Sequence, residues 1–416
     1  MRRAAVYAVW LVLTWACDGA GGQASAADPS NPAQLTTPEC LQRQPDRRGR
    51  FLDVNGDGFA DLAVGAPSAQ STFVYLGGPS GIGSTPAATL VGDVEAGAAV
   101  AAAGDVNHDG FGDLIVGSGM DTATVYLGSA SGVNAAGIAL DPGETLRFGA
   151  TVSTAGDVNG DGFDDVIVGT RYGALIYLGN AGGVATSAAH LLAGPGSAAL
   201  TVVGGVDFNR DGFGDVVVGS GNVGVNIFMG GPAGPSTAPS LTLAGTGGAA
   251  AAGDVNGDHY SDLLVATGSG VDVYAGSRRG LSATPLVTLK DPTGAGFGDA
   301  IGTTLSSAGD VNGDRFDDLV IGSLNGDRAY VFLGGRRGPG VTPARTLTGA
   351  VNSGFGAAVG GAGDTNGDGF SDVIVGARTA GQAFVFLGAT AGPSATPAVT
   401  LTGPARFGES VSRFAR

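Results

Sequence analysis

Aspartate and asparagine recur along this chain in a nine-residue pattern, D-x-N-x-D-x-[FY]-x-D, which occurs seven times at intervals of 47 to 56 residues. Oxygen ligands at positions 1, 3 and 5, a main-chain carbonyl at position 7 and a carboxylate at position 9 suit Ca²⁺. We therefore predict up to seven structural calcium sites. Their predicted side-chain ligands are Asp53, Asn55, Asp57, Asp61, Asp105, Asn107, Asp109, Asp113, Asp157, Asn159, Asp161, Asp165, Asp207, Asn209, Asp211, Asp215, Asp254, Asn256, Asp258, Asp262, Asp310, Asn312, Asp314, Asp318, Asp364, Asn366, Asp368 and Asp372.

Other metal sites fit this pattern less well. An EF-hand needs Glu at position 12 on an outgoing helix, whereas position 12 is Val or Ile in all seven copies. No Cys or His occupies a ligand position, which disfavours zinc. Seven repeats of one site suit a scaffold better than a single catalytic metal centre.

Positions 6 and 7 have their own requirements. Gly58 occupies position 6 of the first copy, where a sharp turn needs a positive φ. His259 and Arg315 replace this glycine in the fifth and sixth copies, so we expect these two sites to bind calcium most weakly. Position 7 is always aromatic, and we expect it to anchor the loop by packing inward.

The segments around each loop predict short strands. An apolar run such as Val166–Gly169 follows each loop, and a second strand such as Val125–Gly128 comes about ten residues later. A third short strand, such as Thr346–Thr348, and a fourth before the next loop, such as Thr151–Thr154, complete the unit. Four strands per unit of about 50 residues predict an all-β fold, a seven-bladed β-propeller with calcium-binding loops.

These motifs resemble a known family. Phe148-Gly149 and three similar pairs provide an "FG" element, and Gly65-Ala66-Pro67 provides a "GAP" element, although the second, fourth and fifth copies lack the Phe-Gly pair. Together with the loops, they resemble the FG-GAP repeats of integrin α heads and of bacterial relatives. The resemblance covers residues 49–416 and implies a propeller that binds a partner in adhesion.

The C-terminal segment predicts how the ring closes. Residues 407–412 repeat the strand that normally precedes a calcium loop, whereas the loop at Asp53 has only Arg50-Phe51-Leu52 before it. We therefore expect the C-terminal strand to complete the first blade, which would remove open sheet edges. A truncated eighth repeat is the alternative.

The N-terminal residues predict export. Arg2 and Arg3 precede an apolar stretch, Ala4–Ala16, that is too short to span a bilayer, so residues 1–16 fit a signal peptide. Cleavage before Cys17 would give a lipoprotein, which we favour, whereas cleavage after Ala24-Ser25-Ala26 would release the protein. Residues 17–48 lack periodicity and predict a flexible tether before the FG-GAP propeller at 49–416. We thus expect a protein at the cell surface, anchored in the outer membrane as a lipoprotein or otherwise secreted.

Composition and motifs limit the function. The net charge is −16 and Lys290 is the only lysine, which argues against nucleic-acid binding and against a phosphate-binding loop. No G-x-S-x-G motif occurs, and His108 and His259 lie inside calcium loops, so we expect no enzyme. We expect a monomeric binding module for an unidentified protein or glycan, touching the membrane only through a lipid on Cys17. A propeller-based polysaccharide lyase or hydrolase and a structural cell-envelope component remain the alternatives.

Overall fold

The computed structural model describes residues 51–412, except for residues 120, 144–146, 197–198, 222, 295–296, 298–303 and 324–325. The predicted signal peptide and tether lie outside these residues. The described part forms seven antiparallel sheets of four strands each and one two-stranded hairpin. Within it, no helix has the length and hydropathy needed to span a membrane.

The strands occupy four layers in each blade. The innermost strands are β30 (Ser410–Val411), β4 (Ala96–Gly104), β8 (Val152–Gly156), β14 (Ala199–Val206), β18 (Ala249–Gly253), β22 (Leu305–Gly309) and β26 (Phe355–Gly363). The second strands are β1 (Leu62–Ala66), β5 (Asp113–Ser118), β9 (Asp165–Gly169), β15 (Asp215–Ser220), β19 (Asp262–Thr267), β23 (Asp318–Ser323) and β27 (Asp372–Ala377). The third strands are β2 (Ser71–Tyr75), β6 (Ala123–Tyr126), β10 (Gly173–Tyr177), β16 (Gly224–Phe228), β20 (Gly270–Tyr274), β24 (Arg328–Phe332) and β28 (Gln382–Phe386). The outer strands are β3 (Ala88–Val91), β7 (Ile138–Ala139), β13 (His190–Ala193), β17 (Leu241–Leu243), β21 (Val287–Leu289), β25 (Arg345–Thr348) and β29 (Val399–Thr402).

Two small elements complete the described part. A 3₁₀ turn, η4 (Pro67–Ala69), connects β1 to β2, and the hairpin consists of β11 (Gly179–Asn180) and β12 (Gly183–Val184).

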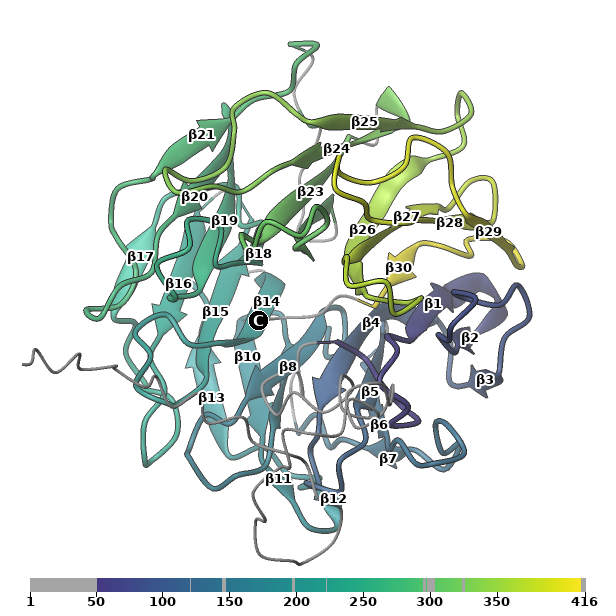
Figure 1. Ribbon diagram of the computed structural model, residues 1–416. Helices are drawn as coiled ribbons and strands as arrows, with labels where there is room; N and C mark the ends of the chain where they lie inside the picture. Colours follow the sequence, from purple (N-terminus) through teal and green to yellow (C-terminus); the bar gives the residue numbers. More distant parts are fainter. Residues whose placement is uncertain are drawn as a thin grey trace, which may run out of the picture. The chain divides into compact units, whose positions relative to one another are not determined.

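The seven sheets follow one another around a ring (Figure 1). Each innermost strand contacts the innermost strand of the next blade, and β30 contacts both β26 and β4. The structure therefore confirms the predicted all-β, seven-bladed β-propeller.

The C-terminal strand completes the first blade, as the sequence predicts. The first sheet has the order β3-β2-β1-β30, and Val64 and Gly65 pair with Val411 and Ser410. The hydroxyl of Ser412 accepts a 3.0 Å hydrogen bond from the N–H of Ala63. Figure 1 shows β30 between β1 and β26, so the two ends of the propeller meet within one sheet.

The hydrophobic core is divided among the blade interfaces. Seven clusters of buried side chains occur, and each joins two neighbouring blades. The second strands are buried along their whole length in six blades, and the sixth position of β19 is the one exception in the seventh. Because both faces of these strands are covered, they lack the alternation of apolar and polar residues that a half-exposed strand shows.

The FG and GAP elements have separate packing roles. Each Phe of the four Phe-Gly pairs packs on an aromatic side chain of the third strand in its own blade; the ring centroids of Phe148 and Tyr177, for example, are 6.0 Å apart. The glycine of the second strand instead faces the next blade. A Cβ on Gly117 would collide with the carbonyl oxygen of Gly149, so only glycine permits this approach of the two blades.

The same contact occurs where the Phe is missing. Gly65 faces the carbonyl of Gly97, and Gly219 faces that of Gly247. Both partners have a positive φ, 89° and 86°, close to the 83° of Gly149. The second and fifth copies therefore keep the glycine of the FG element although they lack its Phe, which the sequence pattern did not reveal.

Candidate metal-binding loops

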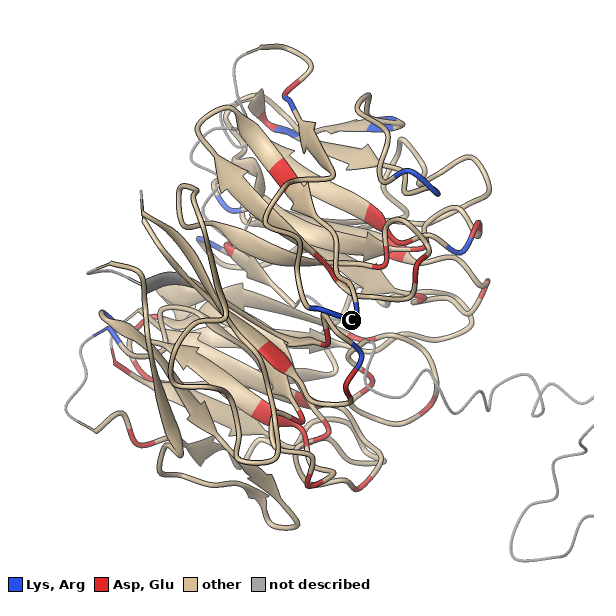
Figure 2. Cartoon of the chain, turned by 90° about the vertical axis from the view of Figure 1, so that its left-hand side faces the viewer, with Lys and Arg blue, Asp and Glu red and all other residues tan. Residues whose placement is uncertain are grey.

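The seven loops lie at corresponding places in the propeller. In six blades the loop connects the innermost strand to the second strand; in the first blade residues 53–61 lead directly into β1. Position 12 falls within the second strand in every copy, as Val64 does in β1, so the loops join strands as predicted and not strand to helix. In Figure 2 the acidic residues recur in loops and at strand ends, whereas basic residues are sparse.

Positions 1, 3 and 5 are brought together by local hydrogen bonds. In the first loop, the carboxylate of Asp53 accepts bonds from the N–H groups of Asp57 (3.2 Å) and Gly58 (3.0 Å). The amide of Asn55 donates to the Asp57 carboxylate at 2.9 Å and accepts from its N–H at 3.2 Å. All seven copies repeat the bond between the amide at position 3 and the carboxylate at position 5.

The carboxylate at position 9 has a different environment. Asp61 is only 2% exposed; its two oxygens accept 2.8 Å bonds from the N–H groups of Val54, at position 2, and Gly77, after the third strand. The same two bonds occur in every copy. Position 9 therefore fastens the loop to the end of the third strand, a role that the sequence did not predict.

Burial also makes these carboxylates hard to ionise. Desolvation, with smaller contributions from the charges at positions 1 and 5, raises the pKa of Asp61 to about 7 and that of Asp262 to about 8. The pKa values of Asp113, Asp165, Asp215, Asp318 and Asp372 are raised to between about 6 and about 8, also mainly by desolvation. Each loop thus concentrates negative charge that a bound cation would stabilise.

The backbone takes a left-handed conformation at both position 4 and position 6. His259 and Arg315, at position 6, have φ values of 73° and 75°, which confirms the positive φ expected there. Position 4 is also left-handed, and it is occupied by His108 (φ 57°) in the second loop and Arg210 (φ 55°) in the fourth. The requirement at position 4 is an additional finding.

The aromatic residue at position 7 does not pack inward. It is only half-buried in all seven copies, and it lies across position 4 of the preceding loop. A Cβ on Gly56 would come within 2.9 Å of the ring of Phe111, and His108 packs edge-to-face on Phe163 at 6.3 Å. The prediction of inward packing was wrong because the apolar surface available to this ring is on the neighbouring loop.

Main-chain hydrogen bonds connect each loop to the next blade. The carbonyl at position 2 accepts a bond from the residue that follows the third-strand glycine of the next blade, as Val54 does from Ser129 at 2.9 Å. This bond occurs at all seven junctions, with distances of 2.9 to 3.1 Å. At six junctions the N–H at position 8 also donates to the carbonyl at position 1 of the preceding loop, as Gly112 does to Asp53 at 2.7 Å.

The donor set fits a hard cation such as Ca²⁺. Carboxylate and amide oxygens at positions 1, 3 and 5 lie within hydrogen-bonding distance of each other, and a carboxylate oxygen that accepts one N–H retains a further lone pair. In residues 51–412, apart from the gaps given above, no three His, Cys, Asp or Glu side chains form a metal-binding group by themselves. A site in these loops would therefore depend on the Asn at position 3 and the main-chain carbonyl at position 7 as well.

Known proteins share these features. The FG-GAP-like repeat model matches residues 53–151, 157–218 and 207–265, which together make up half of the chain. Integrin alpha-PS3 of Drosophila melanogaster is 32% identical over 152 residues, which cover 30% of this chain and 13% of the integrin. Integrin alpha-IIb of Mus musculus is 35% identical over 153 residues, which cover 29% and 14%. The chain thus spans about one seventh of the length of these relatives.

A solved structure shares the fold. A chain in the mercury-soaked crystal of BBS1N in complex with ARL6DN superposes with a TM-score of 0.53 at 10% sequence identity, covering 80% of this chain and 92% of that chain. At this identity the likeness concerns the fold alone. The family match covers half of the chain, and the glycine contacts between blades explain its two namesake motifs. This chain belongs to the FG-GAP-like repeat family.

Proposed function

We propose that this chain is an exported, calcium-stabilised propeller that binds a protein or glycan at the cell surface. One observation carries the calcium role: all seven loops have the same arrangement of oxygen donors, and each loop is bonded to the next blade. A cation held in the loop would therefore stabilise the blade interface as well as the loop.

The expected size of this effect is substantial. Extracellular calcium modules bind with dissociation constants near 0.1 to 1 mM. At about 1 mM calcium and a dissociation constant of about 0.1 mM, each site would add roughly 1.4 kcal/mol to the free energy of unfolding. The seven together would contribute about 10 kcal/mol, comparable with the whole stability of a typical domain.

Thermal unfolding with and without EDTA tests the calcium role. We expect chelation to lower the unfolding midpoint by roughly 10 °C or more and added calcium to restore it. Asp57→Asn should reduce the calcium stoichiometry by one in a calorimetric titration, whereas Asp93→Asn, an exposed carboxylate outside the loops, should not. A midpoint unaffected by EDTA would contradict the proposal.

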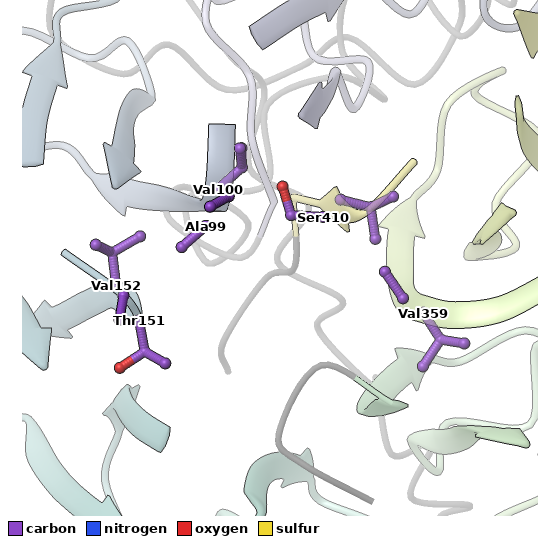
Figure 3. A pocket seen from close by; sticks show the side chains of 10 residues that line it. Ala99, Val100, Thr151, Val152, Val359 and Ser410 are labelled. Atoms are coloured by element: carbon purple, nitrogen blue, oxygen red, sulfur yellow. The ribbon is translucent and has the colours of Figure 1, made fainter. Parts of the chain in front are cut away.

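The binding role is supported by the resemblance to integrin α chains and by the centre of the ring. A narrow cavity there is lined by Ala, Val, Thr and Ser residues from the strands of four blades. Ala99, Val100, Val152 and Val359 border it, and none of its lining residues is a carboxylate, histidine, tyrosine or basic group (Figure 3). This lining offers no general acid or base, which favours a binding module over a lyase or hydrolase.

Cross-linking on intact cells followed by mass spectrometry tests the binding role. We expect the full chain to capture a surface protein or glycan in calcium and to lose it in EDTA. Labelling of the chain at the surface without any captured partner would favour a structural envelope component instead. The predicted signal peptide and the lipid on Cys17 can be checked by the mass of the N-terminal peptide of the mature protein.

A further inference from the structure

Three residues that depart from the repeat pattern meet at one blade junction. Arg210 occupies position 4 of the fourth loop, where five other loops have glycine, and Tyr260 is the only tyrosine at position 7. Arg278 lies in the turn after β20 of the next blade. Together with Asn209 and Asp211, these three residues line a single hollow in the surface.

The contacts common to all junctions bring these residues together. The aromatic residue at position 7 lies across position 4 of the preceding loop, which places Tyr260 beside Arg210. The N–H of Ser277 donates a 3.0 Å bond to the carbonyl of Phe208, which holds the turn with Arg278 against the fourth loop. The hollow is therefore a consequence of the propeller geometry combined with three particular side chains.

Both arginines are available to a ligand. Arg210 and Arg278 are exposed, and neither has an ion-pair partner among the described residues. The carboxylate of Asp211 already accepts bonds from the amide of Asn209 (2.9 Å) and the N–H of Phe213 (3.1 Å). Arg210 also adopts a φ of 55°, a strained conformation for a side chain other than glycine, so a glycine would suit the backbone better.

We propose that this hollow binds the carboxylate or sulfate group of an acidic saccharide. The planar guanidinium groups can each donate two parallel hydrogen bonds to an oxyanion, and the hydroxyl of Tyr260 is a further donor. The proposal rests on the proposed calcium loops in one respect. Asp207, Asp211 and Asp215 of the fourth loop would outweigh the two arginines unless a divalent cation neutralises them, so anion binding should be stronger in calcium.

The adjacent junction provides a matched control. Arg336 occupies the place of Arg278 in the following blade, and the N–H of Gly335 bonds to the carbonyl of Val255 at 2.9 Å just as Ser277 does to Phe208. The neighbouring residues there are Gly257 and Phe316, so this junction has one arginine and no tyrosine hydroxyl.

Calorimetric titration of the full chain with glucuronate, with glucose 6-sulfate and with neutral glucose tests the proposal. We expect the two anions to bind in calcium and glucose not to bind. Arg210→Gly, Tyr260→Phe and Arg278→Ala should together abolish binding, and each arginine variant should weaken it about fivefold or more. Because Arg210→Gly and Tyr260→Phe restore the residues of the other repeats, loss of folding would not account for the result.

The outcomes separate this proposal from the calcium proposal. Binding that survives the triple variant, or that Arg336→Ala weakens equally, would overturn the anion site, and so would equal binding of neutral glucose. A response to glucuronate but not to the sulfate would support the site and assign it to carboxylates; the reverse would assign it to sulfates. Anion binding that is unchanged in EDTA, with an unchanged unfolding midpoint, would support the anion site and overturn the calcium role alone.

Discussion

The backbone N–H of Ala60 donates a 3.0 Å hydrogen bond to the carbonyl oxygen of Asp364, which joins the first calcium-type loop to the seventh. The ring is also closed in its middle, where β30 pairs with β1, and at the end opposite the loops, where Arg406 contacts Glu95 at 2.9 Å and Glu409 at 2.6 Å. The junction between the last and first blades is thus held at three levels.

Arg406→Ala should weaken this junction. Arg406 makes bonds with two carboxylates from different parts of the chain, but its side chain is 39% exposed, which limits the contribution of the ion pairs. We expect the free energy of unfolding to fall by about 1 kcal/mol, measured by urea denaturation. Arg378→Ala is the control, because Arg378 reaches Glu409 only at 3.8 Å and should cost less. Equal losses in the two variants would contradict this account.

Gly65→Ala should be far more damaging. The added methyl group would collide with the carbonyl of Gly97 and the hydroxyl of Ser410, so two blades and the C-terminal strand would have to separate. We expect a loss of about 3 kcal/mol in chemical denaturation. Gly78→Ala, where a Cβ meets no atom within 4 Å, should leave stability nearly unchanged. A well-tolerated Gly65→Ala would show that the blades can move apart at low cost.

His259→Gly and Arg315→Gly should stabilise the protein. Both residues have a left-handed backbone, so glycine should raise the free energy of unfolding by about 1 kcal/mol at each position. Arg315→Gly should also strengthen calcium binding because a positive charge leaves the loop. Gly58→Ala is the reciprocal control: its φ is 89° and no atom is near, so any loss would come from the backbone alone. A destabilised Arg315→Gly would assign the arginine a role of its own.

Without calcium, stability should fall as the pH rises. The pKa of Asp61 is raised to about 7 in the fold from the ordinary value of 3.8, so the folded state binds more protons than the unfolded state between about pH 4 and pH 7. This contribution to stability is fully present below pH 4 and is lost as the pH passes through 7. Urea denaturation in EDTA should give a lower free energy of unfolding at pH 8 than at pH 5. A rise over this range would contradict the raised pKa, and saturating calcium should reduce the slope.

Features with a side-chain signature could be predicted from the sequence. The repeated Asp and Asn residues indicated seven loops, the apolar runs indicated the strands, and the repeat of the strand at 407–412 indicated the closure by β30. The bonds between position 2 and the next blade could not be predicted, because they join main-chain groups that any residue possesses. The placement of the aromatic residue at position 7 depended on which neighbour offers an apolar surface, which only the packed ring defines.

The candidate sites show the same division. The donor types in each loop were readable from one nine-residue segment, whereas the second task of Asp61, holding Gly77, involves a residue beyond that segment. Arg210, Tyr260 and Arg278 each look like an isolated departure from the pattern in the sequence. Their common hollow arises only when two successive blades are packed together.

The pairing of β30 with β1 also sets the time course of folding during synthesis. The ribosome makes β1 near residue 62 but reaches β30 only at residue 410, roughly 20 to 70 s later at ordinary elongation rates. During that interval the first blade has three strands, and one side of β1 has no partner. A nascent chain in this state is exposed to pairing with other strands, so the last segment to be translated determines when the molecule becomes safe from aggregation.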